Sequence, residues 1–143
     1  MKSSSSREDY LIAIYRLTKN QEYINSVSLA KALDVSRASV SEMVKKLIAE
    51  ELISFVDNQI RLTSKGRDRA KNLISSHRLW EIFMTEQLGM SAQEAHDQAH
   101  LLEHITGPTL KAALNRYLDY PTQSPRGNVI WDNLDEAGPS DES

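Results

Sequence analysis

The chain has 143 residues, 40% of them hydrophobic and 26% charged, which is enough to bury a core and is an ordinary globular composition. It contains no cysteine, and this excludes disulfides, cysteine zinc sites and thiol catalysis. The sequence has neither a signal-peptide pattern nor an apolar run that could cross a bilayer, so we expect a cytoplasmic protein without membrane contact.

Charge is divided unevenly along the chain. Residues 1–71 carry 13 Lys and Arg against 9 Asp and Glu, a net charge of +4, whereas residues 72–143 carry 4 against 11, a net charge of −7. A basic half suits a phosphate partner and an acidic half suits a cation. Chance asymmetry on two solvated surfaces is the alternative. We predict two domains with these bounds.

Three helices are predicted in the first half. Apolar residues at helical spacing predict a helix over 7–19. Ser28 is expected to cap a short helix that ends at Leu33, and Ser36 is expected to cap a third helix that runs to about residue 50.

A hairpin is predicted to follow the third helix. Two short runs with alternating polarity, 53–56 and 60–63, flank the polar turn 57–59. Helix, helix, turn, helix and hairpin in this order are typical of a winged helix-turn-helix.

The second half is predicted to be helical. A long helical pattern covers 64–87, and Ser91 with Glu94 forms a capping box that opens a helix to about residue 105. A last helix is expected over 108–118, followed by an extended tail. The predicted fold class is therefore mostly α, with an N-terminal winged helix-turn-helix followed by a helical dimerisation and metal-binding domain.

Apolar residues along the long helix are more numerous than one helix of a small domain needs, and we expect them to form a homodimer interface. Internal packing is the alternative. The residues are Leu73, Ile74, Leu79, Trp80, Ile82, Phe83 and Met84.

Histidines and carboxylates gather in the second half. Histidines 96, 100 and 104 follow one another at every fourth residue of one helix and span an arc of about 80°, and residue 103 falls on the same face. Residues 77 and 81 form a similar pair on the preceding helix. Imidazole and carboxylate are usual ligands of divalent transition metals, whereas isolated surface or core-edge histidines would need no ion. The predicted metal ligands here are His77, Glu81, His96, His100, Glu103 and His104.

The segment HLLEH at 100–104 also matches a zinc-peptidase pattern, in which Glu103 would be the general base. Such an enzyme needs a third protein ligand and a substrate cleft, and it gives a basic winged helix no role. We therefore expect that the protein is not an enzyme.

Several motifs together resemble the diphtheria-toxin-repressor/manganese-transport-regulator family of metal-activated dimeric transcriptional repressors. They are EDYL at 8–11, LAKALDVSRASVSEMVKKL at 29–47, LTSKGR at 62–67, HRLWE at 77–81 and the histidine helix. The resemblance covers about residues 5–133 and is to the short form, which lacks an SH3-like third domain.

The resemblance implies two metal sites. The first would consist of Asp9, His100, Glu103 and His104, and the second, ancillary site of His77, Glu81 and His96. Ile12 stands where manganese-type members have a second carboxylate on the first helix. Hard carboxylates and borderline imidazoles suit Mn²⁺ or Fe²⁺, with Zn²⁺ as the competitor.

The resemblance also implies double-stranded operator DNA as a partner. The third helix would enter the major groove and the wing would lie along the backbone. Basic side chains would contact phosphate, while residue 42 would accept from cytosine N4 or lie outside the footprint. The expected contact residues are Ser36, Arg37, Ser39, Ser41, Glu42, Lys45, Lys46 and Arg61.

The sequence therefore predicts a metal-activated dimeric repressor of genes for metal-ion uptake or homeostasis. A winged-helix regulator that responds to a non-metal effector is the alternative within DNA binding.

Overall fold

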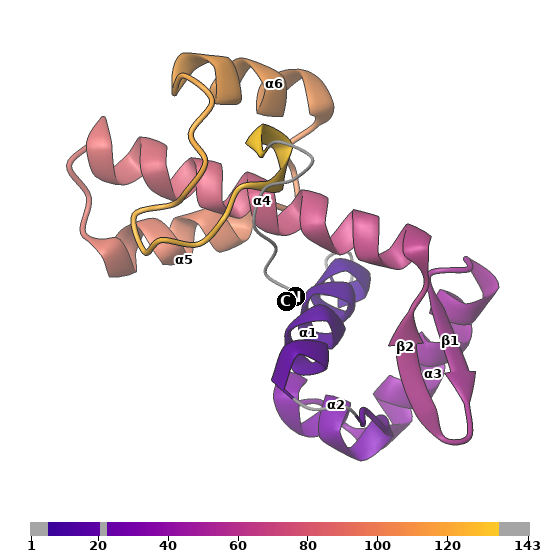
Figure 1. Ribbon diagram of the computed structural model, residues 1–143. Helices are drawn as coiled ribbons and strands as arrows, with labels where there is room; N and C mark the ends of the chain where they lie inside the picture. The colour runs from indigo at the N-terminus through magenta and orange to yellow at the C-terminus, as the bar shows by residue number, and fades with distance from the viewer. Residues whose placement is uncertain (1–5, 21–22, 135–143) are drawn as a thin grey trace. The chain divides into compact units, whose positions relative to one another are not determined.

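The computed structural model describes residues 6–20 and 23–134. The chain forms two compact units, Met1–Lys71 and Asn72–Ser143, and its elements are helices apart from one two-stranded sheet (Figure 1). The predicted, mostly α fold class is confirmed. Within the described residues, no helix is both long and apolar enough to cross a membrane.

The first unit has the predicted order of a winged helix-turn-helix. Its elements are α1 (Ser6–Asn20), α2 (Ser26–Leu33), α3 (Arg37–Ala49), β1 (Ile53–Val56) and β2 (Gln59–Leu62). The core forms because each helix turns an apolar stripe inward: Leu11, Ile14, Leu29, Val40 and Leu47 are fully buried.

The cap of α3 was predicted correctly, but that of α2 was not. Ser36 accepts a hydrogen bond from the Ser39 amide at 3.0 Å, as expected for an N-cap. In α2 the N-cap is Asn25, and Ser28 is the third helical residue, whose hydroxyl accepts from the Asn25 amide at 3.0 Å. The helix begins three residues earlier because this reciprocal pair satisfies two amides at once.

The hairpin turn is one residue shorter than predicted. Val56 pairs with Gln59, so only Asp57 and Asn58 form the turn, and both have positive φ, 53° and 62°. A two-residue turn of this kind matches the twist of the strands, and Asp and Asn tolerate the left-handed region.

In the second unit, helices pack on both sides of one long helix. The elements are α4 (Ser64–Glu86), which begins in the first unit, α5 (Ala92–Leu102), α6 (Pro108–Tyr117) and the 3-10 turn η1 (Trp131–Asn133). Both α5 and α6 lie along α4 (Figure 1), through apolar contacts of Met84 with Ala95 and Ala99 and of Ile82 with Leu114.

Helix α5 ends at Leu102 instead of residue 105. The Thr106 hydroxyl donates to the Leu102 carbonyl, and the Ile105 amide does the same at 3.1 Å. These bonds close the helix before Gly107 and Pro108. Glu103 keeps helical dihedral angles, φ −59° and ψ −30°, so its side chain still follows the face of the histidines.

The segment after α6 was predicted as an extended tail, and this is wrong for residues 120–134. Ile130 is fully buried in a cluster with Leu79, Ile82 and Leu114. Lys111 of α6 pairs with Asp132 at 2.9 Å. One apolar pair, 129–130, anchors an otherwise polar segment because the groove between α4 and α6 is apolar. The acidic end of the predicted tail lies outside the described residues.

The apolar residues of α4 do not form an exposed surface. Five of the seven predicted interface residues, Leu73, Ile74, Leu79, Ile82 and Met84, are buried, and the two aromatic residues pack against the buried clusters. They serve the core, so the argument for a dimer from these residues is wrong. The large apolar side chains that this unit exposes are Leu88, Leu101, Ile105, Leu110, Tyr117 and Tyr120.

Candidate metal centre and DNA-binding surface

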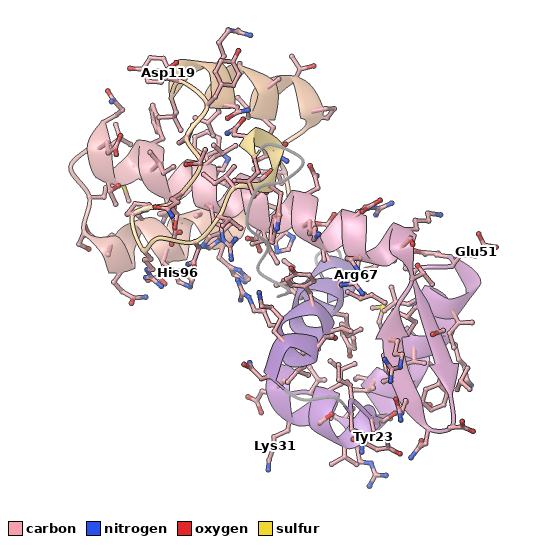
Figure 2. The ribbon with its side chains drawn as sticks, in the orientation of Figure 1. Tyr23, Lys31, Glu51, Arg67, His96 and Asp119 are labelled. Carbon is pink, nitrogen blue, oxygen red and sulfur yellow. The ribbon has the colours of Figure 1, made fainter. Side chains whose placement is uncertain are left out.

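One group of potential ligands joins α4 to α5, and we call it the His96 cluster: His77, Glu81 and His96. Nε2 of His77 lies 3.3 Å from Oε2 of Glu81 and 3.2 Å from Nδ1 of His96. Nδ1 of His96 lies 3.3 Å from the same Glu81 oxygen. His96 lies on α5 (Figure 2) and is partly exposed, whereas His77 and Glu81 are buried.

The second group lies at the carboxyl end of α5, and we call it the His100 cluster: His100, Glu103 and His104. Oε2 of Glu103 is 3.2 Å from Nδ1 of His100 and 3.4 Å from Nε2 of His104. Glu103 is 3% exposed, and its Oε2 makes no hydrogen bond within the described residues. A buried carboxylate oxygen of this kind calls for a further positive partner.

A hydrogen bond connects the two clusters. Nδ1 of His77 lies 2.8 Å from Oε1 of Glu103, and both side chains are buried. The imidazole nitrogen donates and the carboxylate accepts. His77 therefore faces one cluster with each of its ring nitrogens.

Hydrogen bonds and charges together outweigh burial in setting the pKa values of the two buried residues of the His96 cluster. Burial by itself would lower the pKa of His77, but the hydrogen bonds and charges of Glu103 and Glu81 outweigh it and raise that pKa above its ordinary value. Burial would raise the pKa of Glu81, whereas hydrogen bonds from both histidines and the charges of His77 and Arg126 hold it below its usual range. The charged forms are thus mutually stabilised.

Arg126 was missed in the sequence because it belongs to the segment predicted as a tail. Its charge acts on Glu81, which is 45 positions earlier in the sequence. No local pattern marks such a residue. Only the return of residues 120–134 onto the helices brings it near the His96 cluster.

The residues fit a divalent transition metal. In each cluster, the nitrogen and oxygen atoms that would bind an ion lie within 4.8 Å of one another, and two ligands at about 2.1 Å from one ion are at most about 4.2 Å apart. Only a small contraction is required. Imidazole nitrogen and carboxylate oxygen without thiolate suit Mn²⁺, Fe²⁺ or Zn²⁺.

The predicted ligand on the first helix belongs to the other unit. Asp9 lies in the first turn of α1, and its place in the first metal site stays a prediction. Ile12, one turn later, is buried and has no ligand atom, so α1 offers no second carboxylate at that position.

All eight predicted DNA-contact residues are exposed in the first unit: Ser36, Arg37, Ser39, Ser41, Glu42, Lys45, Lys46 and Arg61. Seven of them lie on α3 or at its N-cap, opposite the buried stripe of Val40, Val44 and Leu47. Arg61 lies on β2 of the wing, where its guanidinium donates to Gln59 at 2.8 Å. Their contact with DNA stays a prediction.

Two family models match the chain in succession. "Iron dependent repressor, N-terminal DNA binding domain" matches residues 2–59, and "Iron dependent repressor, metal binding and dimerisation domain" matches residues 63–132.

Individual proteins are similar over nearly the whole chain. The diphtheria toxin repressor of Corynebacterium jeikeium is 32% identical over 138 residues, which cover 94% of this chain and 58% of that protein. An uncharacterised HTH-type transcriptional regulator of Methanocaldococcus jannaschii is 33% identical, over 81% of this chain and 94% of the regulator. The solved structure of the manganese regulator SloR has a TM-score of 0.76 and 36% identity, over 96% of this chain and 60% of SloR.

The chain thus spans somewhat more than half of the length of some of these relatives. The two family models and the archaeal regulator cover it from the winged helix to the segment that closes the second unit. The chain belongs to the diphtheria-toxin-repressor and manganese-regulator family of metal-dependent transcriptional repressors.

Proposed function

We propose that this protein is a metal-activated, dimeric transcriptional repressor that binds operator DNA and controls genes of metal-ion uptake or homeostasis in the cytoplasm. One observation carries the proposal: histidine–carboxylate clusters with buried carboxylates and an exposed basic α3 occur in the same chain. Membership of the family supports it.

The proposed cofactor is Mn²⁺ or Fe²⁺, with Zn²⁺ as the competitor. The ion would supply positive charge to the buried carboxylates Glu81 and Glu103. His100, Glu103 and His104 would hold it in the first site, and Asp9 is proposed as a further ligand on the family resemblance. His77, Glu81 and His96 would hold a second ion. SloR is a manganese regulator, and both family models describe iron-dependent repressors.

The alternatives have less support. A regulator with a non-metal effector gives the two histidine–carboxylate clusters no role. A zinc peptidase would use Glu103 as a base, but Oε1 of that residue is bonded to His77, and members of the family are repressors.

Metal removal tests the proposal directly. The probe is a DNA duplex selected from a random pool with protein and Mn²⁺. The protein is expected to bind it five- to 150-fold more tightly with saturating Mn²⁺ or Fe²⁺ than with EDTA, because this is the usual range of coupling between two sites, here the metal site and the DNA-binding surface. Zn²⁺ is expected to bind tightly but to activate less, because a tetrahedral site forms with fewer ligands. Fluorescence anisotropy with each ion measures this, and an affinity unaffected by EDTA would contradict the metal switch.

A separate prediction concerns the two exposed lysines near the end of α3 and the salt dependence of DNA binding. Lys45→Ala or Lys46→Ala is expected to weaken binding to every sequence alike and to reduce the slope of log affinity against log salt by about one, because a phosphate contact releases about one counterion. Lys31→Ala on α2, exposed and outside the predicted contact set, is the matched control. DNA-binding titrations at several salt concentrations measure the affinity and its salt slope. A loss of affinity that depends on the base at one position would instead indicate that the lysine contacts that base directly.

A further inference from the structure

A tight turn after α6 presents the positive charge of Arg126. The Gly127 amide donates to the Ser124 carbonyl at 2.8 Å, so these two residues enclose Pro125 and Arg126 in a β-turn. Proline fixes φ at the second position of such a turn, and Gly127 has the positive φ, 84°, that glycine adopts without strain. The exposed Arg126 therefore projects from a backbone with little conformational freedom.

The turn is fastened to α4 beside the His96 cluster. At its base, the Ser124 amide donates to the Asn128 carbonyl at 2.8 Å. From α4, the Arg78 guanidinium donates to the Val129 carbonyl at 2.6 Å and lies over the ring of Trp131, 5.0 Å from its centroid. Since residue 78 directly follows a member of the His96 cluster in the sequence, the turn is held close to that cluster.

The charge of Arg126 acts on the carboxylate of the cluster. It stabilises the ionised form of Glu81, whose side chain is 5% exposed. A fixed positive charge at this place has two effects on a divalent cation. It stabilises the carboxylate while the site is empty, and it repels the cation when the cation arrives. Both effects weaken the binding of the ion.

We propose that Arg126 is a tethered cation that sets the affinity of the His96 cluster for its ion. This inference rests on the proposed metal-dependent function. A guanidinium group has no lone pair to offer a cation, so Arg126 would change the concentration of metal that fills the site and not the set of atoms that bind it. The cluster would fill at a higher metal concentration than the same three ligands would without Arg126.

The charge can be separated from the shape of the turn. Arg126→Gln removes the charge and keeps a long polar side chain, whereas Arg126→Lys keeps the charge. Arg116→Gln removes the same charge from an exposed position on α6 and is the matched control.

Zn²⁺ titration of the full chain by calorimetry measures the affinities, and ¹⁵N-histidine NMR identifies the ion of the His96 cluster through the rings of His77 and His96. Arg126→Gln is expected to bind this ion about three- to 10-fold more tightly than the wild type. The gain is modest because Arg126 is exposed and solvent screens its charge. Arg126→Lys and Arg116→Gln are expected to keep the wild-type affinity.

Salt dependence gives a second measurement. The difference between the wild type and Arg126→Gln is expected to shrink when the salt concentration rises from about 0.05 M to about 0.5 M, because the Debye length shortens. A change in the shape of the turn would act equally at both concentrations.

Failure of this inference is distinguishable from failure of the proposed function. An affinity of Arg126→Gln equal to or below that of the wild type would overturn the role of Arg126 and leave the metal-dependent function intact. A gain that Arg126→Lys shares, or one that salt does not reduce, would also overturn it, since the charge would not be the cause. No ion bound to the wild type would overturn both. Circular dichroism checks the fold of each variant.

Discussion

Replacement of Glu103 by Gln is expected to abolish metal-dependent operator binding while the chain stays folded. The Glu103 carboxylate contacts three histidines. One oxygen accepts a hydrogen bond from His77 at 2.8 Å, and the other lies within 3.4 Å of His100 and His104. Gln can keep the first bond through its amide oxygen. It presents an amide nitrogen, which is not a metal ligand, where the second oxygen lies.

The expected loss of Mn²⁺ affinity at the His100 cluster is at least about 100-fold, because even an outer-shell partner is worth 10- to 100-fold. At Mn²⁺ concentrations that saturate the wild type, operator affinity should fall to its value in EDTA. Calorimetry and anisotropy measure the two effects, with circular dichroism for the fold. Glu86→Gln, an exposed carboxylate in the last turn of α4, makes the same charge change away from both clusters. Metal activation retained in Glu103→Gln would exclude Glu103 from the site.

A second large effect is expected on stability. Gly66→Ala places a Cβ atom 2.0 Å from the backbone oxygen of Leu52 and 3.2 Å from a methyl of Leu62. The start of α4 is held against the loop between α3 and β1, since the Thr63 amide donates to the same Leu52 oxygen at 3.0 Å. Neither backbone segment can move without loss of that bond. Only glycine therefore allows the close approach.

Helix propensity alone would favour Ala by about 1 kcal/mol, but overpacking against a backbone atom that cannot move is expected to cost about 3 kcal/mol, the upper end of the usual range. The free energy of unfolding is thus expected to fall by about 2 kcal/mol, which lowers the urea midpoint by about 1 M. Urea unfolding followed by circular dichroism measures this. Gly107→Ala is the control, because its Cβ meets no atom within 4 Å and the change at that N-cap should cost under about 1 kcal/mol. Equal stability of the two variants would contradict the contact.

Most features that depend on neighbours within four residues were predictable from the sequence, although the cap of α2, the length of the hairpin turn and the end of α5 were not. The caps at Ser36 and Ser91 bond to amides three positions on, and the hairpin follows from two short alternating runs. The histidine face of α5 follows from helical spacing alone, and it survives the early end of the helix because Glu103 keeps helical dihedral angles. Local hydrogen bonding and side-chain periodicity decide such features whatever the rest of the chain does.

Features that join distant segments were decided only by the tertiary structure. Seven apolar residues of α4 looked like an interface, but five of them, Leu79, Trp80, Ile82, Phe83 and Met84, pack in clusters with residues of α5, α6 and the segment that contains Ile130. The need for glycine at position 66 comes from Leu52, which lies in the loop between α3 and β1. The bond from His77 to Glu103 spans 26 residues, and no periodicity encodes it, because it depends on how α5 is seated along α4. The sequence determined which chemical groups the helices present, and packing between elements determined which of those groups meet.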